Sequence, residues 1–275
     1  MERAGRLLSL AVCLLAVAAC SAGSGGSGDG ARPDARVSAP APSAGLDAPG
    51  KKDLAQRIVS SAENSSLDWR AQYDYVEDIG DGRGYTAGII GFTTGTHDLL
   101  VLVERYTKSH PDNALARYLP ALREVDGSGS HEGLGAGFEA AWQAESRKPA
   151  FERAQDAERD RVYFGPAVRL AKRDGLGALG QFVYYDAMVM HGPGTDPGFH
   201  GLRERAVAQA DTPAEGGDEK AYLDVFLDVR REAMKSEGRD TSRVDTAQRR
   251  FLYDGNLGLE TPLKWEVYGQ PYEIR

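Results

Sequence analysis

Apolar residues recur at helical spacing along most of the chain after residue 50, and this pattern predicts a mainly helical protein. From Lys51, the positions Leu54, Ile58 and Ala62 fall on one face of a helix that reaches Glu63. The segment 176–190, LGALGQFVYYDAMVM, is apolar on nearly all sides and is therefore predicted to be the central, buried helix. Similar spacing predicts further helices over 96–107, 112–125, 138–144, 150–164, 166–174, 219–236 and 243–255.

A glycine-rich stretch at residues 78–92, DIGDGRGYTAGIIGF, interrupts the helical pattern. Its glycines alternate with polar and β-branched residues, which is typical of a hairpin in which glycine takes positive φ or lets two backbones approach. A nucleotide-binding glycine loop is not favoured, because no apolar strand precedes the stretch and the Gly-Lys-Ser/Thr ending is missing. The last residues, LKWEVYGQPYEI, are predicted to form a short extended tail.

The N-terminus has the pattern of an export signal. Arg3 and Arg6 precede the apolar run LLSLAVCLLAVAA, which is too short for a permanent membrane span of about 20 residues. Residues 1–19 are therefore interpreted as a signal peptide. The sequence VAAC at 17–20 resembles a bacterial lipobox, in which Cys20 is lipidated, but it also fits ordinary signal cleavage. The protein is expected outside the cell, either secreted or held at the membrane by a lipid on Cys20.

Residues 20–45 are mostly Gly, Ser, Ala and Pro, so they predict a flexible tether that cannot bury enough apolar surface to fold. Residues 46–275 are predicted to form the folded domain. The whole chain has 275 residues, of which 27% are charged and 41% hydrophobic, with a formal net charge of −8. No basic stripe is present, which argues against nucleic acid as a partner.

Two carboxylates, Glu63 and Asp81, are set in different surroundings and separated by 18 positions (81 − 63). Glu63 lies at the edge of the apolar stripe near a helix end, where partial desolvation favours the neutral form that a general acid requires. Asp81 lies in the glycine-rich turn. Two carboxylates in unlike environments are the minimum for acid/base cleavage of a glycosidic bond. Periodicity alone equally fits an ordinary glutamate at the flank of a helix.

Three further charges fall on apolar helix faces, and each requires a partner. Asp186 lies on the buried face of the central helix, and Arg230 shares a face with Leu223 and Phe226. Arg243 lies at the start of the last predicted helix. Such charges are expected to form buried ion pairs, which are usually structural. The histidines show no metal-ligand spacing, no Gly-x-Ser-x-Gly motif is present, and the tryptophans are predicted to be core residues.

Several motifs together resemble the bacterial chitosanases of glycoside hydrolase family 46. They are SSAENSSLDW, EDIGDGRGYTAGIIGF, ERDRVYF, GQFVYYDAMVMHGPG and DTSRVDT. The resemblance implies a mainly α, lysozyme-like (α+β) fold over residues 46–275, with two helical lobes and a small β-sheet at the cleft. It also implies endo-acting, inverting hydrolysis of chitosan without a cofactor or metal, by a protein expected to be a monomer.

The resemblance also implies a role for each matching residue. Glu63 would be the general acid, Asp81 the general base, and Thr86 would help to orient the attacking water. A supporting charge network is implied at Asp186, Arg230 and Arg243. Substrate-binding roles are implied for Asp98, Arg83, Tyr75 and His191.

Two other functions remain compatible with the sequence. A lysozyme-like peptidoglycan hydrolase would use the same carboxylates on an acetylated polymer, although the acidic chain and Asp98 favour a substrate with free ammonium groups. A chitosan-binding lipoprotein without catalysis is the other alternative.

Overall fold

The structure is a computed structural model that describes residues 45–275, and these residues belong to one compact unit. The predicted signal peptide, the lipidation site at Cys20 and residues 20–44 of the predicted tether lie outside the described residues. Within residues 45–275, no helix is both long enough and apolar enough to cross a membrane.

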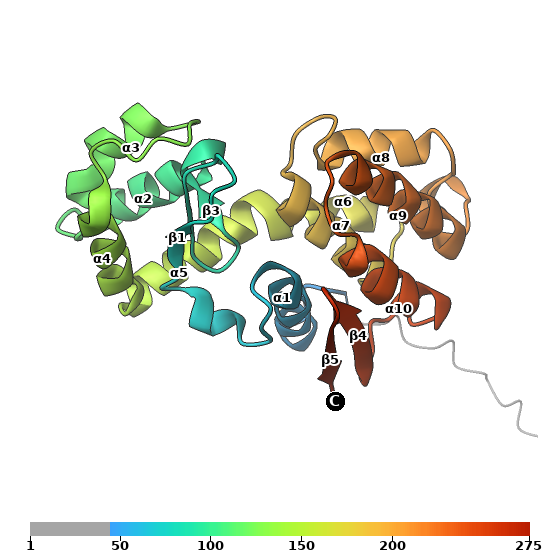
Figure 1. The fold of residues 1–275 in the computed structure, drawn as a ribbon. Coiled ribbons are helices and arrows are strands. Elements are labelled where there is room, and N and C mark those ends of the chain that lie inside the picture. The colour runs from blue at the N-terminus through green and yellow to red at the C-terminus, as the bar shows by residue number, and fades with distance from the viewer. Residues whose placement is uncertain (1–44) are drawn as a thin grey trace, which may run out of the picture. The chain divides into compact units, whose positions relative to one another are not determined.

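One lobe of the unit combines short helices with a small sheet (Figure 1). Its three-stranded antiparallel sheet has the order β1-β2-β3, and Asp78 of β1 lies opposite Tyr85 of β2. The core of this lobe is aromatic, with Phe138 and Trp142 fully buried. Its elements are β1 (Val76–Asp78), β2 (Tyr85–Ala87), β3 (Phe92–Thr93), α2 (Asp98–Ser109), α3 (Leu119–Val125) and α4 (Gly135–Ser146).

A long helical segment connects this lobe to the rest of the unit (Figure 1). It consists of α5 (Pro149–Arg159), a π-helical turn η4 (Asp160–Phe164) and α6 (Gly165–Arg173). Charged residues are buried along it, since Glu158 is 1% exposed and Arg159 is 3% exposed. Each is paired: Arg161 and Arg105 contact Glu158, and Arg159 bonds to acidic neighbours on its own helix.

The second lobe is built around α7 (Ala178–His191), which is buried from Ala178 to Met188 as its apolar sequence predicts. The remaining elements are α1 (Pro49–Glu63), η1 (Trp69–Gln72), α8 (Phe199–Val207), α9 (Glu219–Ser236), the π-helical η6 (Arg243–Gln248), α10 (Arg249–Tyr253), β4 (Leu263–Val267) and β5 (Gln270–Ile274), with short 3-10 turns elsewhere.

The two ends of the described chain meet at α1, beside which the β4–β5 hairpin lies (Figure 1). Trp265 of β4 is 2% exposed, and its indole Nε1 donates a hydrogen bond of 3.0 Å to Ser61 Oγ of α1. Ser61 itself donates to the carbonyl of Ile58. The hairpin is thereby attached to the last turn of the helix that ends at Glu63.

The predicted class, a mostly helical protein with small antiparallel sheets, is confirmed. The predicted helix over 219–236 agrees with α9, and the glycine-rich stretch forms the β1–β2 hairpin. Three details of the prediction are wrong. The helix predicted over 112–125 is replaced at 112–118 by turns and a 3-10 helix, and the predicted extended tail is a β-hairpin. The helix α8 was missed. Asn113 accounts for the first, because its side chain bonds to His110 O and Leu115 N and closes a turn there.

Candidate active site

Two adjoining cavities lie between the β1–β2 hairpin and the second lobe. One has a volume of about 380 Å³ and includes Glu63, Thr86 and Arg243 in its lining. The other, of about 300 Å³, includes Asp98 and His191. They share one wall, which is formed by Arg83, Ile90, Gly91, Val189, Met190 and Arg239.

A continuous chain of ion pairs runs from the cavity into the core. Arg243 Nη1 lies 2.7 Å from Glu63 Oε1, and Arg243 Nη2 lies 2.7 Å from Asp186 Oδ1. Arg230 Nη2 in turn lies 2.7 Å from Asp186 Oδ2. The Glu63 side chain is 27% exposed, whereas those of Asp186 and Arg230 are at most 2% exposed. The structure therefore brings together Glu63 and all three predicted network residues.

Asp186 carries full charge in this network. Burial alone would raise the pKa of its carboxyl, but the guanidinium groups of Arg243 and Arg230 outweigh burial and hold the pKa well below its usual value. Gln248 Nε2 also donates to Asp186 Oδ2 at 2.6 Å, and Gln248 Oε1 accepts from Arg230 Nη1 at 2.9 Å. The interior charges are thus compensated both by opposite charge and by hydrogen bonds.

The π-helical turn η6 explains how two residues of one short segment reach the same carboxylate. A π-turn closes i→i+5 hydrogen bonds, and here the N–H of Arg249 bonds to the carbonyl of Val244. The wider turn places residues five apart, Arg243 and Gln248, on the same side, where both contact Asp186. Gln248 was not identified from the sequence, because α-helical spacing would put it on another face.

His191, at the end of α7, extends the same network to the second cavity. Arg230 Nε donates to His191 Nε2 at 3.3 Å, so this nitrogen must be unprotonated. Burial, together with the positive charges of Arg230 and Arg243, lowers the pKa of His191 to about 3. His191 therefore presents a neutral imidazole to the cavity near neutral pH.

Asp81 lies in the six-residue turn between β1 and β2. Its Oδ1 accepts from the Arg83 N–H at 3.0 Å and its Oδ2 from Arg83 Nε at 2.7 Å. Partial burial raises the pKa of Asp81, but these bonds outweigh it and the pKa is lowered. Asp81 is not among the residues that line either cavity, whereas its partner Arg83 lines both.

A second loop, which contains Gly129 and His131, packs against the turn that carries Asp81. A Cβ added to Gly129 would lie 2.6 Å from the carbonyl oxygen of Gly82, so only glycine permits this backbone contact. Nearby, the ring of His131 stacks on Tyr85 at 4.4 Å, and His131 Nε2 lies 3.3 Å from Asp78. The turn that carries Asp81 is thereby supported at its tip and at its base.

Thr86 is the middle residue of β2 and lines the Glu63 cavity. Its Oγ1 is buried and has no hydrogen-bond partner among the described residues. A buried hydroxyl without a partner is costly, since its lost hydration is not replaced. The geometry is therefore suited to a hydroxyl that bonds to a small polar molecule in the cavity.

Asp98 is the first residue of α2 and lines the second cavity. Burial raises its pKa, and hydrogen bonds from Tyr163, Thr93 and Thr96 only partly offset this effect. The Tyr163 hydroxyl bonds to Oδ2 at 2.7 Å, while Oδ1 accepts from Thr93 N and Thr96 Oγ1. Asp98 is thus fixed in orientation at the end of the paired cavities away from Glu63.

The sequence did not predict several residues of the Glu63 cavity, and four of them have large or charged side chains: Ile79, Arg239, Asp240 and Tyr268. Arg239 lines both cavities, and its positive charge contributes to the lowered pKa of Asp81. Tyr75, which was predicted, lines the Glu63 cavity. None of the four has a signal in helical periodicity, because all lie in turns or at helix ends.

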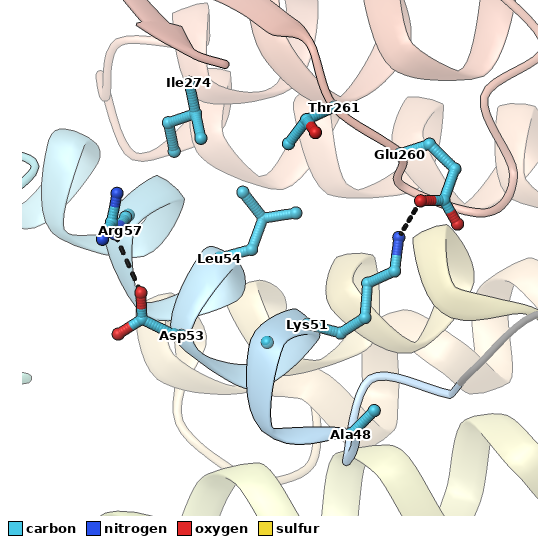
Figure 2. Close-up of a pocket in the computed structure, with 9 residues that line it drawn as sticks. Ala48, Lys51, Asp53, Leu54, Arg57, Glu260, Thr261 and Ile274 are labelled. Atoms are coloured by element: carbon cyan, nitrogen blue, oxygen red, sulfur yellow. Dashed lines mark hydrogen bonds and ion pairs between the residues drawn. The ribbon is translucent and has the colours of Figure 1, made fainter.

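A third cavity, of about 420 Å³, lies between the first turns of α1 and the residues Glu260, Thr261 and Ile274 (Figure 2). Lys51 and Glu260 form an ion pair of 2.8 Å across it, and Arg57 pairs with Asp53 on the same helix. None of the predicted site residues lines it. Among residues 45–275, no group of three His, Cys, Asp or Glu side chains lies close enough to hold a metal ion.

A mostly helical fold with Glu63 paired to the buried Arg243 at a cavity agrees with the class of glycoside hydrolases that have a lysozyme-like fold. The chain belongs to glycosyl hydrolase family 46, whose sequence profile matches residues 57–263. It is 57% identical to a chitosanase of Streptomyces sp. (strain N174) over 270 residues, which cover 97% of this chain and 96% of that one.

Solved structures show the same relationship. A co-crystal structure of chitosanase OU01 with substrate matches with a TM-score of 0.83 and 56% identity, over 84% of this chain and 99% of that one. The complex of Gynuella sunshinyii GH46 chitosanase GsCsn46A with chitotetraose matches with a TM-score of 0.75 and 33% identity, over 82% and 97% of the two chains.

Replacing Arg230 tests the buried network. Arg230→Ala should lower the free energy of unfolding by about 3 to 5 kcal/mol, because it leaves the charge of Asp186 buried with one partner fewer. Urea unfolding followed by circular dichroism measures the change. The neighbouring Arg231, whose side chain is 41% exposed, is the matched control, and Arg231→Ala should stay within about 0.5 kcal/mol. An unchanged midpoint for Arg230→Ala would contradict the role of the ion pair.

The lowered pKa of His191 makes stability depend on pH. The pKa of His191 is about 3 in the folded protein and about 6.5, the ordinary value, in the unfolded chain. At pH values between these two, the unfolded chain binds a proton at His191 that the folded protein does not bind, so the free energy of unfolding must fall as the pH falls. The loss in unfolding free energy from about pH 7 to about pH 4.5 should be smaller in His191→Asn than in wild type. The exposed His110 is the control, and His110→Asn should keep the wild-type slope. Equal slopes in all three proteins would refute the assignment.

Proposed function

We propose that the protein is an endo-acting chitosanase that hydrolyses internal β-1,4 bonds of chitosan with inversion, without a cofactor. The observation that carries the proposal is Glu63, which lies in the cavity at the end of the ion-pair chain through Arg243 to Asp186. The names of the related proteins, which are chitosanases, support the same substrate.

Glu63 acts as the general acid and protonates the leaving glycosidic oxygen. Arg243 contacts Glu63 through Nη1 and Asp186 through Nη2, so two carboxyl groups share its positive charge. The same geometry fixes the direction of the Glu63 carboxyl. Once Glu63 has given up its proton, Arg243 stabilises the carboxylate that forms.

Asp81 acts as the general base. Its lowered pKa keeps it ionised near neutral pH, the form that accepts a proton from water. Thr86 lines the cavity, and its buried hydroxyl has no partner within residues 45–275, which supports a role in holding the attacking water. An inverting mechanism leaves room for that water, with carboxyl groups about 6.5 to 9.5 Å apart when substrate is bound.

A polymer of glucosamine fits the charges of the site. Asp98, held by Tyr163 at the far end of the paired cavities, would bind a substrate ammonium group, and Asp240 adds a second carboxylate to the Glu63 cavity. Arg83, Tyr75 and His191 would contact other groups of the polymer from the cavity walls. The net charge of −8 would attract a polycation at long range.

The sequence pattern at residues 1–20 supports export of this activity. We propose that a monomeric domain acts outside the cell, and that Cys20 either carries a lipid or is the first residue after ordinary cleavage.

A reducing-end assay on soluble chitosan tests the function. The wild-type protein should release reducing ends, and Glu63→Gln should lower the rate by at least about a hundredfold while keeping the melting temperature. Glu124→Gln, at an exposed glutamate outside the cavities, is the matched control and should keep the wild-type rate. Release from cell walls rather than chitosan would favour a peptidoglycan hydrolase. Oligomer binding without reducing ends would indicate a non-catalytic binding protein.

The stereochemistry of the first product tests the mechanism separately. Proton NMR recorded during hydrolysis should show the α-anomer first, since a single displacement inverts the β-linkage. Appearance of the β-anomer before mutarotation would refute inversion and leave the hydrolase assignment intact.

A further inference from the structure

Large apolar side chains are rarely exposed in this structure, and two of those that are lie in one cavity. Among the described residues, the exposed large hydrophobic side chains are Ile79 (49%), Tyr253 (56%) and Tyr268 (51%). Ile79 and Tyr268 both line the Glu63 cavity, although one lies in the β1–β2 turn and the other in the β4–β5 turn. Paired exposed apolar groups in one concave site indicate a binding surface.

The backbone of Tyr268 is strained. The register of the β4–β5 hairpin leaves a two-residue loop, Tyr268 and Gly269, and both have positive φ, 53° and 76°. Such loops favour Asn-Gly or Gly-Gly, and a bulky residue with positive φ costs stability. Strain of this kind persists where the side chain serves a site.

The backbone of Tyr268 is held in place relative to Glu63. The Tyr268 N–H donates to Ser242 Oγ at 2.9 Å, and Thr246 Oγ1 bonds to the carbonyl of Glu266. Trp265 of the same hairpin bonds to Ser61, two residues before Glu63. The tyrosine is therefore presented by a hairpin anchored to both α1 and η6.

Tyr268 lines the same cavity as Glu63, Asp240 and Arg243, and their charges influence its phenol. Partial burial raises the pKa of Tyr268. The positive charge of Arg243 lowers it, and the negative charges of Glu63 and Asp240 raise it. Tyr268 thus offers the cavity an aromatic ring and a phenol, an apolar body with a polar tip.

We propose that Tyr268 and Ile79 together bind the pyranose ring of one sugar unit, next to Glu63 and away from Asp98. The inference rests on the proposed function, because it assumes an amino-sugar polymer in the cavity. A pyranose ring presents C–H groups on its faces, which pack on an aromatic ring, while its substituents point outward to polar groups. Tyrosine supplies this rigid contact at low entropic cost.

Binding of a chitosan hexamer, measured by calorimetry in the Glu63→Gln background, tests the proposal without hydrolysis. Adding Tyr268→Ala should weaken binding about three- to tenfold, the scale of one aromatic contact, and Ile79→Ala should weaken it less. Tyr268→Phe should bind like the parent, since the ring makes the contact. Tyr253→Ala, which removes an equally exposed tyrosine outside the cavity, should leave binding unchanged.

Tyr268→Asn separates a binding role from a structural one. Asn suits positive φ, so the melting temperature should stay equal or rise, while hexamer binding weakens as in Tyr268→Ala. In the active protein the same change should raise KM more than it lowers kcat. Unchanged affinity in Tyr268→Ala, or no hexamer binding by the parent, would overturn the inference. A failed reducing-end assay with hexamer binding intact would instead overturn the hydrolase function alone.

Discussion

The charge of Asp186 in the middle of the second lobe is the constraint on which the site depends. A carboxylate that is 1% exposed is stable there only because Arg230 and Arg243 both contact it and Gln248 bonds to it. Asp186 belongs to α7 and its partners to α9 and η6, so the network sets how these three elements pack against one another. Because Arg243 also reaches Glu63, that arrangement sets the orientation of the cavity carboxylate.

The other side of the cavity is organised by backbone rather than by buried charge. Asp81 is held by Arg83 in a turn with several positive-φ glycines, and Gly129 packs against Gly82 where a Cβ would not fit. Backbone contact of this kind gives precise placement without a hydrophobic core, which suits a short hairpin at the edge of a cavity. The two carboxylates thus depend on different physical supports.

The C-terminal hairpin adds a further wall to the cavity and is bonded to α1 and η6. Trp265 packs in the core and bonds to α1, while the strained Tyr268 at the tip faces the cavity. An element that looks peripheral in the chain order therefore contributes both stability and a binding surface. A rigid scaffold that carries a strained tip is a common arrangement at ligand sites.

Periodicity alone predicted the buried α7, the helix α9 and the need of Asp186, Arg230 and Arg243 for partners, because burial pattern and charge are local properties of the sequence. The same reasoning indicated Glu63 at a helix end, and the motifs indicated Asp81 and the family. Only the tertiary structure decided that Gln248 joins this network, because a π-turn changes the side to which its side chain points. It also decided that Tyr268 enters the cavity, since a two-residue turn in an apparent tail becomes a cavity wall only when the hairpin packs on α1.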